Sequence, residues 1–249
     1  MWTSVALLIG SLFLPAAPAP RTPVLVELFT SEGCSSCPPA DALLARLLEG
    51  TPVDGVDVVA LGLHVDYWDR LGWKDPFSSP LFSQRQEAYG RIFGEDRIYT
   101  PQMVVDGAAE FVGSDSAAAA KAIRAASEKP HVPIGASADL RGDLVRIAAD
   151  APPVPPGTSE KIAVLVALVE DGLTSNVKRG ENSGRTLTHA AVVRRIETIG
   201  ALDRDAFAGE GQWKLNPAWD RAKLRVVAFL QGQSTRKVYG SAQVRLAAR

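Results

Sequence analysis

Apolar runs and helical periodicity alternate through the first half of the chain. Residues 24–30 and 56–63 form nearly continuous apolar runs, which predict two buried strands of a parallel sheet. Apolar residues recur at helical spacing over 40–48, and residues 80–93 and 114–127 also predict helices. This alternation of strands and helices predicts an α/β domain.

The pattern changes at about residue 130. Before this point, two short runs on either side of Asp106-Gly107 predict a β-hairpin. Beyond it, short alternating or apolar runs are separated by turn signals, with few helical patterns, which is typical of an antiparallel β-sandwich. We therefore expect two domains, at about residues 24–129 and 132–249.

Residues 1–20 have the composition of a targeting segment. The stretch from Val5 to Leu14 is uncharged, apolar and too short to span a bilayer, and Ala17-Pro18-Ala19 offers a small-x-small cleavage site. We therefore predict a signal peptide and a periplasmic or secreted protein. Against this, no Lys or Arg precedes the stretch, and Pro20 would follow the cleaved bond. The alternatives are an uncleaved segment, which would be the one contact with a membrane, or a buried N-terminal segment.

The cysteines indicate a class of function, whereas the net charge does not. The 249-residue chain has a formal net charge of −1, and nothing in it predicts a nucleic-acid partner. Its two cysteines occur as Cys34-Ser35-Ser36-Cys37, between the first predicted strand and the first predicted helix. A helix N-terminus carries free N–H groups and partial positive charge, which both favour a thiolate. We therefore predict a redox-active dithiol, with Cys34 as the exposed nucleophile and Cys37 as the partly covered resolving thiol.

Two other roles for the cysteine pair stay open. A static disulfide would fix the first loop, although its small ring at a helix start argues against this role. A zinc site needs four ligands, and only His64, His131 and His189 could join the two cysteines. Because the chain has no third cysteine, any exchange must involve another molecule. We expect this protein to form mixed disulfides with exported proteins or with a redox partner.

The order of elements over residues 24–129 resembles the thioredoxin fold, with the C-x-x-C after the first strand and Thr100-Pro101 just before the hairpin. The resemblance implies a cis peptide bond at Pro101 that faces the disulfide. It also implies that the backbone at Thr100 and Pro101 binds an extended substrate. The expected fold class is therefore an α/β thioredoxin-like domain followed by an antiparallel β-sandwich domain.

The residues around the pair depart from ordinary thioredoxins. Gly33 stands where tryptophan is usual, and Ser-Ser replaces Gly-Pro between the cysteines. No aspartate lies six residues before Cys34. Glu27 lies one position earlier than that, and as a buried acid it could relay a proton to or from Cys37. A glutamate that is held in the strand by hydrogen bonds is an equal alternative.

Three further groups of residues sharpen the comparison. They are the segment 26–41, the motif 64–69 with 71–73, and the run 180–187 followed by His189. Together they resemble an uncharacterised family of secreted thioredoxin-like proteins with a C-terminal β domain, over nearly the full length of the chain. The resemblance implies a fold, whereas the activity of that family is not established.

An aromatic-rich segment follows the second predicted strand. Because ligands bind beyond the carboxyl ends of strands in α/β sheets, this segment should lie near the cysteines. Trp68 and Trp73 could line a substrate groove, and the alternative is a small extra core or a contact with the β domain. His64 could stabilise a thiolate, although a hydrogen-bonded structural role is more common for such a residue. We assign His189 no chemistry.

The leading hypothesis is an exported thiol–disulfide oxidoreductase that uses Cys34 and Cys37, without a cofactor, on disulfides of proteins or small molecules. The second is a periplasmic copper(I)-binding protein that holds the metal with the same cysteines, helped by His64 or Met103. The third is a noncatalytic interaction module. The leading hypothesis assigns no metal site.

Overall fold

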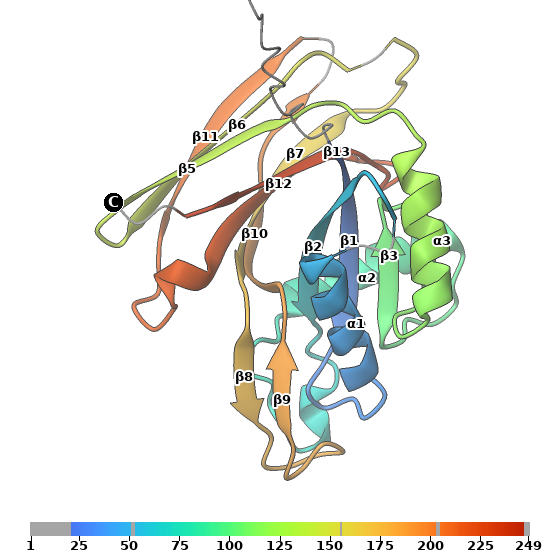
Figure 1. The fold of residues 1–249 in the computed structure, drawn as a ribbon, viewed down its shortest axis with the longest axis vertical. Coiled ribbons are helices and arrows are strands. Elements are labelled where there is room, and N and C mark those ends of the chain that lie inside the picture. The colour runs from blue at the N-terminus through green and yellow to red at the C-terminus, as the bar shows by residue number, and fades with distance from the viewer. Residues whose placement is uncertain (1–20, 51–52, 155, 203–204, 247–249) are drawn as a thin grey trace, which may run out of the picture.

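One mixed sheet of eight strands passes through both halves of the chain (Figure 1). The computed structural model describes residues 21–50, 53–154, 156–202 and 205–246, so the predicted signal peptide lies outside the described residues. The elements are, in chain order, β1 (Thr22–Thr30), α1 (Pro38–Glu49), β2 (Val56–His64), η1 (Asp69–Leu71), α2 (Pro80–Phe93), β3 (Gln102–Val105), β4 (Ala109–Val112), α3 (Ser116–Ser127), β5 (Gly135–Arg141), β6 (Leu144–Ala151), β7 (Ile162–Glu170), β8 (Leu173–Asn176), β9 (Thr186–His189), β10 (Val192–Leu202), β11 (Phe207–Lys214), η2 (Arg221–Lys223), β12 (Leu224–Gly232) and β13 (Val238–Arg245). The large sheet has the order β13-β12-β7-β10-β2-β1-β3-β4, and two smaller sheets have the orders β11-β6-β5 and β8-β9.

Local sequence patterns predicted the three helices and the β3–β4 hairpin correctly. Pro38 and Pro39 occupy the first turn of α1, where N–H groups have no partner within the helix. Asp115 caps α3, because its carboxylate accepts hydrogen bonds from the Ala117 and Ala118 N–H groups. Among the residues that the structure describes, no helix has the length and apolar character needed to cross a membrane.

The predicted fold class, an α/β thioredoxin-like domain followed by an antiparallel β-sandwich, is wrong. Strands from the second half continue the sheet of the first half, because β10 lies parallel to β2 with Val192 opposite Gly62. The Gly62 N–H donates to the Ala191 carbonyl at 2.6 Å. Hydrophobic patterning indicates which face of a strand is buried but does not identify the neighbouring strand, so it could not predict this long-range pairing. The boundaries of the two expected domains stay a prediction.

Side chains complete the hydrogen bonding where the sheet passes from one half to the other. β10 and β2 share one registered pair, so β10 leaves most of that edge of β2 uncovered. Arg225 Nη2, from β12, donates to the Ala60 carbonyl at 2.8 Å. Gln243 Nε2, from β13, donates to the Val58 carbonyl at 3.4 Å. These long polar side chains take the place of strand backbone and satisfy carbonyl groups that would otherwise be buried unpaired.

The central strands are buried on both faces. In β7, Leu165 and Ala167 join a core that also contains residues of β1, β2 and α1. The alternate residues Val166 and Leu168 join a second core with residues of β6 and β11. Successive side chains of a strand point to opposite faces, which explains how one strand serves both cores. The same arrangement explains why residues 162–169 read as a continuous apolar run.

The β8–β9 hairpin leaves the large sheet and lies beside α1 (Figure 1). Its strands pair with Leu173 opposite His189. The connection between them, residues 177–185, reaches the turn that joins β1 to α1. A segment from the second half of the chain therefore contacts the segment that carries both cysteines.

Candidate functional site

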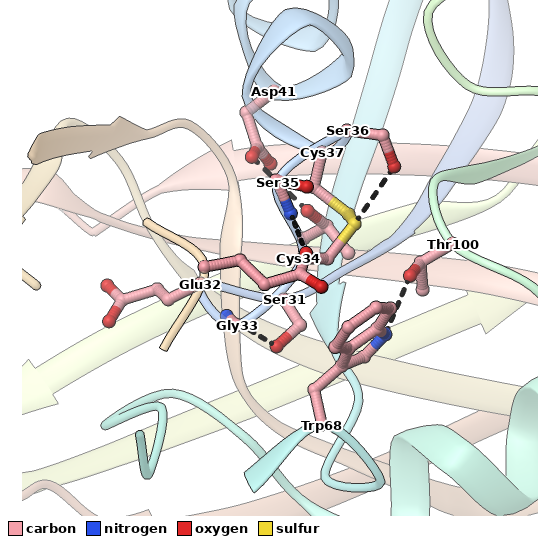
Figure 2. The surroundings of a disulfide bond; sticks show 12 residues. Ser31, Glu32, Gly33, Cys34, Ser35, Ser36, Cys37, Asp41, Trp68 and Thr100 are labelled. Atoms are coloured by element: carbon pink, nitrogen blue, oxygen red, sulfur yellow. Dashed lines mark hydrogen bonds between the residues drawn. A yellow bond between two sulfur atoms is a disulfide. The ribbon is translucent and has the colours of Figure 1, made fainter. Parts of the chain in front are cut away.

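Cys34 and Cys37 form a disulfide in the turn between β1 and α1 (Figure 2). Their Cα atoms are 5.4 Å apart, and the Ser36 hydroxyl lies 3.3 Å from the Cys34 sulfur. Ser35 and Ser36 are exposed, but both cysteines are 0% exposed. The expectation of an exposed Cys34 sulfur is therefore wrong. Cys37 occupies the cap position of α1, and Cys34 lies three residues before it in the turn.

Few backbone donors at the start of α1 are free to stabilise a thiolate. Pro38 and Pro39 have no N–H, and the Ala40 and Asp41 N–H groups donate to the Cys37 carbonyl at 2.8 and 3.1 Å. The Cys37 N–H donates to the carbonyl of Cys34 at 3.2 Å. The thiolate stabilisation expected from free N–H groups is thus smaller than the sequence implied, although the helix dipole still points at the turn.

The Thr100–Pro101 peptide bond is cis, as the resemblance to thioredoxins implied. Because Gln102 pairs with Phe29 near the end of β1, this peptide lies at the end of the sheet where β1 leads into the dithiol turn. A Cβ atom added to Gly113 would lie 3.2 Å from both the Pro101 and the Ala40 Cβ atoms, so Pro101 is close to the start of α1. The cis bond is confirmed, whereas the expectation that Pro101 faces the disulfide stays a prediction.

The two predicted groove residues both contact the segment before Cys34. Trp68 donates from its indole N–H to the Thr100 hydroxyl at 2.8 Å and lies beside the turn (Figure 2). Its Cβ is so close to Gly33 that a Cβ added there would be 3.1 Å away. Trp73 donates to Glu32 Oε2 at 2.7 Å. Both indoles are half-buried, so they pack against the turn and also keep an exposed edge.

His64 belongs to a buried hydrogen-bond network. Its Nδ1 lies 2.7 Å from Asp75 Oδ2, and its ring packs edge-on against the His189 ring at 4.8 Å between centroids. Asp75 Oδ2 also accepts from the Glu32 N–H at 2.8 Å. Burial opposes ionisation of Asp75, but His64 and the backbone N–H groups outweigh it and lower the pKa of this carboxyl. These contacts give His64 the hydrogen-bonded role that was the alternative to thiolate stabilisation.

Glu27 lies on the sheet face that α2 covers. Its carboxylate accepts from Arg85 Nε at 2.6 Å and from Arg85 Nη2 at 3.1 Å, and it also accepts from the Tyr89 hydroxyl. The neighbouring Leu28 side chain points toward Ala40 of α1, as the alternation of a strand requires. The proposed proton relay from Glu27 to Cys37 stays a prediction, and these contacts favour the structural alternative.

The interpretation of the sequence missed a group of buried residues from both halves of the chain. The Glu32 carboxylate accepts hydrogen bonds from Ser175 and from Trp73, and its Oε1 lies 3.1 Å from His189 Nε2. The fully buried Asn182 donates to the backbone carbonyls of Glu32 and Cys34, each at 2.9 Å. The one available signal was the motif 180–187 with His189, which carried the family resemblance but had no assigned chemistry.

Asp41 is a buried acid in the first turn of α1. It accepts a hydrogen bond from the Thr30 hydroxyl at 3.2 Å and lies 4.0 Å from His189 Nδ1. His189 Nδ1 is buried without a hydrogen-bond partner among the described residues. Burial raises the pKa of Asp41 to about 7. Within the described part of the chain, no three His, Cys, Asp or Glu side chains are grouped to hold a metal ion.

Comparison with known proteins gives a family but no activity. Residues 25–231 match the family described as "Protein of unknown function (DUF1223)". The chain belongs to this family. The match confirms the predicted resemblance to an uncharacterised family, and no curated protein matches the chain.

Two solved structures are similar to this chain over most of its length. One is a crystal structure of a protein from Agrobacterium tumefaciens, with 28% identity and a TM-score of 0.70, covering 92% of this chain and 96% of that chain. The other is HBP35 of Porphyromonas gingivalis, with 14% identity and a TM-score of 0.65, covering 92% of this chain and 76% of that chain. At this identity the second likeness concerns the fold alone. The architecture of both halves together therefore recurs in other proteins.

Proposed function

We propose that this chain is an exported thiol–disulfide oxidoreductase whose Cys34–Cys37 pair exchanges with disulfides of other exported proteins or of small molecules. The observation that supports it most is the position of the disulfide, which joins residues three apart at the start of a helix. By loop-closure entropy, so short a cross-link stabilises a fold by only about 2 kcal/mol. A purely structural role would gain little at this position.

The chemistry requires only the two cysteines and a partner. In the reducing direction, the Cys34 thiolate attacks a substrate disulfide, forms a mixed disulfide and releases one substrate thiolate. Cys37 then loses its proton to solvent and attacks the Cys34 sulfur, which releases the second substrate thiolate and re-forms the Cys34–Cys37 disulfide. Two electrons pass to the substrate. Because the chain has no other cysteine, an external dithiol must reduce the pair again.

The surroundings of the pair support a binding surface for a partner. Thr100 and the exposed Ser36 lie on the side of the turn where the sulfur of Cys34 is drawn, and Trp68 lies alongside (Figure 2). A polar surface beside a half-buried indole suits a peptide that carries a disulfide. Both sulfurs are buried, so exchange requires a covering group to move first.

Trapping of mixed disulfides tests the proposal. Purified protein is reduced, freed of reductant and mixed with excess glutathione disulfide, and the products are quenched by alkylation and followed by mass spectrometry. The wild type should return to its internal disulfide, and Cys37→Ser should accumulate a glutathione adduct on Cys34. Cys34→Ser is the matched control and should form its adduct at least about tenfold more slowly, because Cys37 is the resolving thiol. Equal rates for the two variants would overturn the assignment, and no reaction of either would overturn the function.

Export needs a test of its own. The chain is produced in a bacterial host with and without residues 1–20, and the periplasm, medium and cytosol are assayed separately. Export predicts that the full chain reaches the periplasm or medium and that the shortened chain stays in the cytosol. Full chain found in the cytosol alone would overturn this part of the proposal.

A further inference from the structure

The connection between β8 and β9 is hydrogen-bonded to the backbone of the disulfide turn. Asn182, in the middle of this connection, is fully buried, and its side-chain amide donates to the carbonyls of Glu32 and Cys34 at 2.9 Å each. The Ser35 N–H donates to Glu181 Oε2, also at 2.9 Å. Three hydrogen bonds thus join residues of the second half to the backbone on both sides of the Cys34 side chain.

We propose that residues 177–185 form a displaceable cover over the Cys34–Cys37 disulfide, and that Asn182 is the positioning residue that holds this cover closed. The inference rests on the proposed function, because it supplies the access step that exchange at a buried disulfide needs. The cover must leave before a thiolate can reach the Cys34 sulfur, and it can return when the disulfide has re-formed.

The cover has the structure of a unit that can move without disturbing the large sheet. Its residues connect two strands that pair with each other and not with the eight-stranded sheet. Of residues 177–185, Val177 and Asn182 are buried, and the others are exposed. The Gly184 N–H donates to the Val177 carbonyl at 2.8 Å, and Arg185 Nη1 donates to Asn182 Oδ1 at 2.8 Å. The cover therefore keeps its own shape through internal hydrogen bonds, while side chains of Glu181 and Asn182 hydrogen-bond it to the turn.

The cover also acts on the chemistry of the sulfur. The Ser35 N–H is next to Cys34 in the chain and is one of the donors that could stabilise a Cys34 thiolate. Glu181 occupies this donor and brings a negative charge close to the position where the thiolate charge would develop. A closed cover thus disfavours the thiolate, and an open cover frees the donor and removes the charge.

The test compares variants that keep the shape of the cover but change its hydrogen bonds. Asn182→Asp keeps the size of the side chain, loses both N–H donors and places carboxylate oxygens against the carbonyls of Glu32 and Cys34. Asn176→Asp is the matched control, because Asn176 is exposed in β8 and its Oδ1 only accepts a hydrogen bond from Thr186. Glu181→Gln is a second variant at an exposed position, so its effect does not depend on the stability of the fold.

The measured quantity is the rate at which excess tris(2-carboxyethyl)phosphine reduces the disulfide of the oxidised, folded protein. The phosphine needs neither partner recognition nor a protein thiolate, so its rate reports access to the sulfur alone. We expect Asn182→Asp to react about tenfold faster than the wild type or more, Glu181→Gln about threefold faster, and Asn176→Asp within about twofold. In the reduced protein, Glu181→Gln should shift the pH profile of Cys34 alkylation to lower pH.

Unchanged phosphine rates in both Asn182→Asp and Glu181→Gln, with folding confirmed by circular dichroism, would overturn the cover. If Asn182→Asp does not fold, an unchanged rate in Glu181→Gln alone overturns it. This test is independent of the proposed function. Faster phosphine reduction in the variants would support the cover even if glutathione disulfide formed no adduct with the protein. Faster reduction in the variants together with trapping on Cys34 supports both.

Discussion

Glu32 and His189 are 157 residues apart in the sequence, yet Glu32 Oε1 lies 3.1 Å from His189 Nε2 beside the disulfide turn. Both side chains are buried. The same carboxylate accepts hydrogen bonds from Trp73 and Ser175. One acidic residue therefore connects the hairpin of the second half, the aromatic segment and the strand that leads to Cys34.

Removing this carboxylate should destabilise the protein strongly. Glu32→Ala removes the acceptor of the half-buried Trp73 and Ser175 and of the buried His189, so we expect the free energy of unfolding to fall by about 3–5 kcal/mol. Urea denaturation followed by circular dichroism measures the change. Glu87→Ala, at an exposed position of α2, is the control and should stay within about 0.5 kcal/mol of the wild type. A loss below about 1 kcal/mol for Glu32→Ala would contradict the importance of this network.

The ion pair between Glu27 and Arg85 should behave as a structural unit. Arg85→Leu leaves the Glu27 carboxylate buried without its charged partner, so the expected loss of stability is about 3–5 kcal/mol. The double variant Glu27→Leu/Arg85→Leu removes the lone charge and should recover part of that loss. A double-mutant cycle by urea denaturation gives the coupling energy, and additive losses would show that the pair is not coupled.

The sequence sufficed for features that depend on neighbours along the chain. The apolar runs of β1 and β2 and the helical spacing of α1 are all local, and each predicted its element correctly. The position of Thr100-Pro101 was also predictable, because it follows from the order of elements.

Features that depend on distant parts of the chain were not predictable in this way. The pairing of Val192 with Gly62 and the contact of Asn182 with Cys34 join segments far apart in the sequence. Periodicity assigns a strand to a face but not to a partner, so the sequence predicted a separate β-sandwich rather than one sheet that joins both halves. The burial of Cys34 was also missed, and the hydrogen bond from Asn182 to the Cys34 carbonyl shows that a residue of the second half packs against this segment.

Gly62 is required where the two halves of the sheet meet. A Cβ atom at this position would lie 2.9 Å from the Ala190 carbonyl oxygen, so backbone would have to shift, and 3.2 Å from that of Ala191, which is a tight contact. We therefore expect Gly62→Ala to reduce the free energy of unfolding by about 1–3 kcal/mol. Gly50→Ala is the matched control, because its Cβ would meet nothing within 4 Å and its φ of 179° suits any residue. Equal stability of the two variants in urea would contradict the close approach of β2 and β10.

Because of Asp41, the free energy of unfolding should decrease measurably as pH rises. Burial is the largest cause that raises its pKa to about 7, nearby Asp75 and Glu32 add to the rise, and His189 and Thr30 oppose it. An unfolded aspartate titrates near pH 4, so between about pH 4 and 7 the folded state holds a proton that the unfolded state has lost. The folded state binds more protons in this window, and stability therefore decreases as pH rises.

Asp41→Asn isolates this contribution, because asparagine keeps the size of the side chain and does not ionise. Relative to the wild type, the free energy of unfolding of the variant should rise from pH 5 to pH 7, by at most about 1.4 kcal/mol per pH unit, and level off above pH 7. Urea denaturation at pH 5, 6, 7 and 8 measures the difference. Thr30→Val removes a hydrogen bond that lowers the pKa of Asp41. In this variant the loss of stability with rising pH should therefore extend to higher pH than in the wild type. Parallel curves for wild type and Asp41→Asn would mean that this carboxyl is already ionised in the folded protein at pH 5.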